Sequence, residues 1–183
     1  MSVVAVERLM LKSKLRRAVE RDELVILYHP NVDLRDGRVV GAEALIRWHH
    51  PARGRISPVE FINVAEDSGQ IVEIGRWVLV EACRSVREWR DSIAGGDGLR
   101  LAVNISGRHL QHADLVADVR HALEESGLEP GNLVIELTES TIMHNTEVNL
   151  SRLRDLKSLG VRLAIDDFGT GYSSLQYLKQ LPL

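Results

Sequence analysis

The sequence predicts an α/β fold in which helices alternate with mostly parallel strands that curve toward a β/α barrel. From residue 99 onward, short apolar runs alternate with amphipathic stretches, the order expected of strand–helix–strand units with right-handed crossovers. The main strands also share a pattern of one apolar face and one mixed face that carries a carboxylate or amide. We expect about five strands, which is fewer than the eight of a complete barrel.

Length and composition are those of one globular domain, so we expect residues 1–183 to form a single unit. Charged residues make up 27% of the chain and the net charge is −3, so bulk charge does not favour a nucleic-acid or membrane-surface partner. Cys83 is the only cysteine, which excludes an intramolecular disulfide and fits a reducing compartment. No apolar run reaches the roughly 18 residues of a membrane span, and no signal peptide is evident. We therefore expect no membrane segment and a cytoplasmic location.

The first half of the chain is predicted to form helices over residues 5–20, 58–68 and 71–93 and strands over residues 24–28 and 39–48. Pro30 is expected to end the first strand, and Gly37 marks a turn, so the two strands would begin the sheet as a hairpin. Ser57 and Glu60 have capping-box spacing at the start of one helix, and Gly69 is placed to end it.

The second half is predicted to form strands over residues 99–106, 132–138 and 161–166 and helices over residues 109–126, 146–159 and 173–179. Gly127 and Gly160 are expected to end two of these helices, because glycine readily adopts the left-handed conformation found after a helix. This regular order of strands and helices is what predicts parallel pairing.

Strand alternation places one oxygen-bearing side chain on the mixed face of each of four strands. These side chains are Glu43, Asn104, Glu136 and Asp166. Each alone has an ordinary explanation as a loop cap, an ion-pair member or a solvated edge residue. Four at corresponding positions favour a shared site, because converging carboxylates are costly unless a cation neutralises them. Oxygen ligands suit Mg²⁺ or Mn²⁺ better than Zn²⁺.

Residues 163–175 read as a strand, two adjacent carboxylates, and a glycine-rich turn that opens a helix. Asp166 and Asp167 lie where the strand stops, and two carboxylates fixed there can bind a hard divalent cation. In the ordinary alternative, Asp166 ends the strand and Asp167 shapes the turn.

Four motifs together resemble the EAL-domain cyclic di-GMP phosphodiesterases, from about residue 15 to the last residue. The motifs are Glu43-Ala44-Leu45, Asn104-Ile105-Ser106, Glu136-Leu137-Thr138-Glu139 and Asp166-Asp167-Phe168-Gly169-Thr170-Gly171. The resemblance implies a modified TIM-type barrel with one antiparallel strand. It also implies hydrolysis of cyclic di-GMP to linear pGpG with two Mg²⁺ or Mn²⁺ ions, in bacterial second-messenger signalling.

The resemblance also implies residue roles. The four oxygen-bearing side chains would hold the first metal ion, with Asp166 bridging to the second ion and Asp167 as a further ligand. Glu43 would thereby be catalytic, and Glu139 would support catalysis by ordering the glycine-rich loop. Arg47, four residues after Glu43, would contact a substrate phosphate.

Two features depart from the family pattern. His29 stands where members often carry a glutamine that contacts substrate. The chain also ends at Leu183, before the expected Lys-x-Asp motif and a later glutamate of the second metal site. We therefore expect the N-terminal two-thirds of an EAL domain, with little or no turnover by itself.

Several alternatives remain open. The chain could be a degenerate EAL module that binds cyclic di-GMP or a protein partner without catalysis. A second chain or a swapped homodimer could complete the barrel, and a sensory or GGDEF domain could be attached in a longer parent. A glycosidase-like barrel that uses Glu136 and Glu139 is weaker, since it leaves the other oxygen-bearing side chains unexplained.

Overall fold

The computed structural model describes residues 3–143, 146–166 and 181–182. Its sheet has six strands, with β1, β2, β4, β5 and β6 side by side in that order and β3 paired to β2. β1 and β2 are antiparallel, whereas β2, β4, β5 and β6 pair in parallel. The strands are β1 (Leu24–Val32), β2 (Val39–His50), β3 (Gly54–Ile56), β4 (Arg100–Asn104), β5 (Leu133–Thr138) and β6 (Arg162–Asp166). The predicted mostly parallel sheet with one antiparallel hairpin is confirmed, and β3 is an additional short strand.

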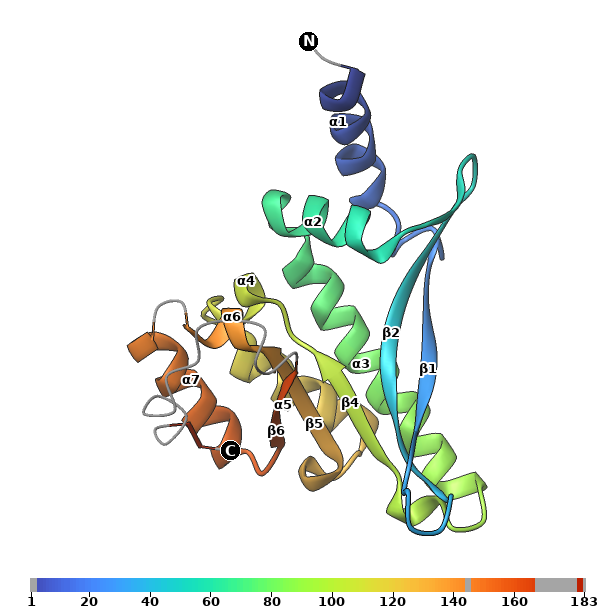
Figure 1. The fold of residues 1–183 in the computed structure, drawn as a ribbon, viewed down its shortest axis with the longest axis vertical. Helices are drawn as coiled ribbons and strands as arrows, with labels where there is room; N and C mark the ends of the chain where they lie inside the picture. The colour runs from blue at the N-terminus through green and yellow to red at the C-terminus, as the bar shows by residue number, and fades with distance from the viewer. Residues whose placement is uncertain (1–2, 144–145, 167–180, 183) are drawn as a thin grey trace.

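Helices α3, α5 and α7 lie along one side of the sheet, and α1 extends beyond α2 at the N-terminal end (Figure 1). The helices are α1 (Val3–Leu15), α2 (Pro58–Ser68), α3 (Ile71–Ser92), α4 (Gly107–Leu110), α5 (Leu115–Ser126), α6 (Glu139–Met143) and α7 (Thr146–Ser158). Two short 3₁₀ turns, Gly96–Gly98 and Pro130–Asn132, precede β4 and β5. No helix within the described residues is long and apolar enough to cross a membrane.

The core lies between the sheet and the helices. Leu101, Leu133 and Ile135 are fully buried on the helix-facing side of the strands. The burial pattern of β5 alternates strictly, so its even-numbered side chains face the other side and are partly exposed. Cys83 is buried in α3, and burial raises the pKa of its thiol to about 12, which agrees with an inert packing role.

Glycines directly follow the ends of two helices, as predicted. Gly69 and Gly127 both adopt the left-handed conformation, with φ of 82° and 68°. The Gly69 N–H donates to the Glu66 carbonyl at the end of α2. The capping-box prediction is only half right: α2 begins at Pro58, but the Ser57 side chain makes no capping hydrogen bond.

Three predicted boundaries are wrong. β1 continues past Pro30 to Val32, which the sheet tolerates because β1 is its edge strand and needs no donor on its outer side. α1 ends at Leu15 instead of residue 20, and turns lead from there into β1. The helix predicted over residues 109–126 is divided into α4 and α5.

The division has a packing reason. Leu110 and Leu115 are both fully buried. In one continuous helix they would point about 140° apart, so the break lets both reach the core. The helix predicted over residues 173–179 lies outside the described residues.

Candidate metal and nucleotide site

Strand register places the four oxygen-bearing side chains on one face of the sheet. Glu43 pairs with Ala102, Asn104 pairs with Glu136, and Thr138 pairs with Asp166. Directly paired residues share a face, as do residues two apart on one strand, so the four side chains lie on the same side. Asn104 and Asp166 are the last residues of β4 and β6, and the set therefore gathers toward the C-terminal ends of the parallel strands.

Asn104 on β4 contacts Glu43 on the neighbouring strand β2 directly. Its Nδ2 donates to Glu43 Oε1 at 2.7 Å, over 61 residues of sequence. The hydrogen bond occupies the amide nitrogen, so the amide oxygen is the Asn104 atom that could bind a cation. A carboxylate and an amide oxygen are thus held together at one point of the sheet.

Glu136 is the most perturbed carboxyl group of this set. Burial, together with the negative charges of Glu43 and Asp166, raises its pKa to about 6. The charges of Glu43 and Asp166 therefore lie close enough to repel that of Glu136. A bound cation would reverse this effect, because a positive charge favours the ionised carboxylate.

The described carboxylates do not by themselves close a metal site. Within residues 3–143, 146–166 and 181–182, no three His, Cys, Asp or Glu side chains are grouped closely enough to hold an ion. Asp167 and the glycine-rich turn lie outside the described residues. What the structure contributes is Glu43, Asn104, Glu136 and Asp166 on one face, with an amide oxygen among the donors.

The two predicted substrate contacts lie on the same face as Glu43. His29 pairs with Glu43 across the β1–β2 hairpin and is exposed. Arg47 lies four residues further along β2, and its guanidinium donates to the Ile46 carbonyl at 2.8 Å. Arg47 also lines a cavity of about 300 Å³ whose wall includes Asn104. The Arg47 guanidinium and the Asn104 side chain thus border one hollow.

Glu139 differs from this set because it is buried and lies in a helix. It is 7% exposed and is the first residue of α6, directly after β5. The loop that it is predicted to order lies outside the described residues.

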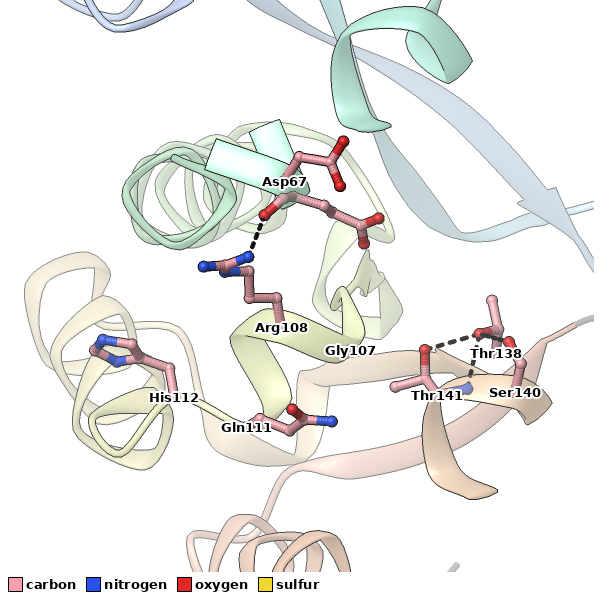
Figure 2. Close-up of a pocket in the computed structure, with 9 residues that line it drawn as sticks. Asp67, Gly107, Arg108, Gln111, His112, Thr138, Ser140 and Thr141 are labelled. Atoms are coloured by element: carbon pink, nitrogen blue, oxygen red, sulfur yellow. Dashed lines mark hydrogen bonds between the residues drawn. The ribbon is translucent and has the colours of Figure 1, made fainter. Parts of the chain in front are cut away.

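A larger cavity of about 740 Å³ lies beside the first, where α2 ends and α4 and α6 begin (Figure 2). Arg108 crosses it and donates to the Glu66 carbonyl at 2.7 Å. On the other side, the Thr138 hydroxyl is 3.1 Å from that of Ser140 and 2.9 Å from that of Thr141. Sequence reasoning missed this hollow, although Arg108 stands only four residues after Asn104, a predicted site residue.

The sheet and these side chains define a β/α-barrel type of domain with a candidate divalent-cation site at its strand ends. A sequence profile of the EAL domain matches residues 12–183. The chain belongs to the EAL domain family.

Two relatives from Pseudomonas aeruginosa match nearly the whole chain. The bifunctional diguanylate cyclase/cyclic di-GMP phosphodiesterase MucR is 49% identical over 182 residues, covering 100% of this chain and 26% of MucR. The cyclic di-GMP phosphodiesterase NbdA is 46% identical over 181 residues, covering 99% of this chain and 23% of NbdA. The chain therefore spans about a quarter of the length of these relatives.

Solved structures agree with the fold. The PaMucR phosphodiesterase in complex with c-di-GMP is 48% identical and superposes with a TM-score of 0.89, over 94% of this chain and 69% of that one. The EAL enzyme Bd1971, in its cAMP- and cyclic-di-GMP-bound form, is 33% identical with a TM-score of 0.91, over 100% of this chain and 50% of that one. The predicted barrel-type α/β fold is confirmed by these neighbours.

Proposed function

We propose that this chain belongs to a cyclic di-GMP phosphodiesterase, which hydrolyses one phosphodiester bond of cyclic di-GMP to give linear pGpG. The observation that carries the proposal is the placement of Glu43, Asn104, Glu136 and Asp166 on one face of four neighbouring strands. The likeness to PaMucR in complex with c-di-GMP supports the same substrate.

The proposed cofactor is a pair of Mg²⁺ or Mn²⁺ ions. Glu43, Asn104, Glu136 and Asp166 would hold the first ion, and Asp167 would join Asp166 at the second. The donor set fits, because hard divalent cations prefer carboxylate and amide oxygens. The raised pKa of Glu136 also fits, since the neighbouring carboxylates Glu43 and Asp166 help to raise it and a bound cation would oppose them. Such ions, when bound, activate a water and stabilise the leaving oxygen.

The chain's own residues would then bind and orient the substrate. Arg47 is placed to donate to a phosphate oxygen, a role for which the planar guanidinium is well suited. His29, directly opposite Glu43 on the neighbouring strand, would contact the same part of the substrate from β1. Glu139 would order the loop after β6 and so complete the site.

The domain and assembly proposals follow from the family. We propose that residues 1–183 form one unit corresponding to the N-terminal two-thirds of an EAL domain, in keeping with the 69% coverage of the PaMucR chain. A longer parent with a GGDEF or sensory domain is supported by the size of MucR and by its description as bifunctional. We further propose a cytoplasmic location, where a nucleotide messenger would be met.

The test is conversion of cyclic di-GMP to pGpG with Mn²⁺, separated by chromatography. We expect little product from residues 1–183, because the family's lysine and a further metal ligand are predicted beyond Leu183. A domain extended through that segment should turn over the substrate, and Glu43→Ala in the extended domain should abolish product. Tight cyclic di-GMP binding without turnover in the extended domain would favour the non-catalytic module instead.

A further inference from the structure

A buried histidine outside the proposed metal set lies just after β4. His109 is 1% exposed and lies in α4, the short helix that begins three residues after Asn104. The Ser106 side chain caps this helix by accepting from the His109 N–H at 3.1 Å, and the Ser106 carbonyl accepts from Leu110 at 2.9 Å. The position of α4 therefore determines the path of the chain immediately after Asn104.

The His109 ring is held from two sides by the helices that flank α4. Its Nε2 lies 3.1 Å from Asp118 Oδ2 on α5. On the other side the ring lies against α3 at Gly75, where an added Cβ would come within 2.4 Å of His109 Nδ1. Gly75 thus leaves the space that the ring fills, and α4 is fastened between α3 and α5.

Asp118 is itself fixed by a second partner. Arg76 on α3 donates through Nε to Asp118 Oδ1 at 2.8 Å, so each carboxylate oxygen of Asp118 has one partner. Arg76 also contacts Asp114 at 3.3 Å. The carboxylate therefore faces His109 in a set orientation.

Burial lowers the pKa of His109, the neighbouring Arg76 and His112 act in the same direction, and Asp118 opposes them. A neutral imidazole has a single N–H. The acidic partner at Nε2 favours the tautomer that carries its hydrogen there, which makes His109 a donor to Asp118. A side chain that lacks this donor would leave Asp118 Oδ2 unpaired beneath α4.

We propose that His109 is a positioning residue: by donating to Asp118 and filling the space at Gly75, it holds the β4–α4 turn so that Asn104 stays against Glu43. Its consequence for metal binding rests on the proposed function, whereas its effect on Asn104 does not. His109 also lines the cavity bordered by Arg47 and Asn104, so displacement of the ring changes the wall of that cavity.

The first test reads Asn104 directly. The side-chain amide signals of Asn104 are assigned in ¹H–¹⁵N spectra by their loss in Asn104→Asp, and then followed in His109→Leu and His109→Gln. Leucine keeps most of the volume but has no donor, while glutamine can donate an amide hydrogen to Asp118. We expect the Asn104 amide pair to shift in the leucine variant and to stay in place in the glutamine variant.

His121→Ala is the matched control, because His121 is exposed on α5 and belongs to neither cavity. Gly75→Ala is an independent variant that leaves His109 intact but intrudes on its ring, and it should shift Asn104 as the leucine variant does. Unchanged Asn104 signals in His109→Leu would overturn the proposal. A shift of equal size in His109→Gln would also overturn it, because the donor would then be irrelevant.

The second test measures Mn²⁺ binding by electron paramagnetic resonance. We expect His109→Leu to weaken binding by about tenfold, as for residues that orient a metal ligand, and His109→Gln to restore it. Equal Mn²⁺ affinity in His109→Leu and the unaltered protein would contradict the positioning role. If the extended domain bound no Mn²⁺, the proposed function would fail, while the Asn104 spectra would still decide the role of His109.

Discussion

The two faces of β5 show how differently one strand can serve the molecule. Ile135 is fully buried against the helices, and its neighbour Glu136 points to the opposite side, where burial and two other carboxylates raise its pKa to about 6. One face lowers the free energy of the fold by removing apolar surface from water. The other places like charges together, which opposes folding and which the proposed cation would offset.

The largest effect on stability is expected on the helix-facing side. Ile135→Ala should lower the free energy of unfolding by about 2–5 kcal/mol, because it removes buried methyl groups and leaves a cavity. Chemical denaturation checks this value, with Val134→Ala as the partly exposed neighbour for comparison. A loss no larger than that of Val134→Ala would mean that the two faces do not differ as described.

Asn104→Ala should instead separate function from stability. It removes the hydrogen bond to Glu43 and the proposed amide ligand, so we expect Mn²⁺ affinity to fall by about 10- to 100-fold. Calorimetric titration with Mn²⁺ measures the change. Full affinity with the alanine in place would remove Asn104 from the metal set.

Whereas Ile135→Ala lowers the free energy of unfolding, Glu136→Gln should raise it in metal-free protein. It removes repulsion at a half-exposed carboxyl, so the free energy of unfolding should rise by about 1 kcal/mol or less. A decrease in the free energy of unfolding with EDTA present would show that Glu136 does not experience the charge repulsion described.

We also expect the stability gain from Glu136→Gln to depend on pH. The folded-state pKa of Glu136 is raised from 4.5 to about 6, so the native protein binds this proton more tightly than the unfolded chain. Its contribution to stability is therefore lost as pH rises from about 4.5 through about 6. The gain from Glu136→Gln should be near zero below this window and complete above it. Denaturation at several pH values measures the gain, and a constant difference across the window would contradict the pKa shift.

The smallest effect is expected at the surface. Arg87 and Asp91 form an i,i+4 ion pair on α3 at 3.1 Å with both side chains substantially exposed. Arg87→Ala should change the free energy of unfolding by less than about 0.5 kcal/mol. Thermal unfolding at low and high salt provides the check, and a larger loss would mean that Arg87 packs as well as pairs.

Local patterns predicted much of this domain, because strand alternation and helix termination depend on neighbouring residues. The burial of β5 follows the predicted period-2 alternation, and Gly69 and Gly127 end helices where a positive φ is needed. Local patterns were misleading at Pro30, which was expected to end the first strand. A proline interrupts a central strand but is accepted in an edge strand, and β1 is an edge strand. Whether a strand lies at an edge depends on its partners, which are distant in sequence.

The amino-acid sequence alone determined the residue types of the candidate site and the face of each strand on which they lie. Tertiary structure decided that Asn104 reaches Glu43, that α4 and α5 are separate, and that Arg108 spans a cavity toward Glu66. It also decided that His109 is enclosed between Gly75 and Asp118. The physical reason is that register and helix packing are set by contacts between segments far apart in the chain, and no local window contains both partners.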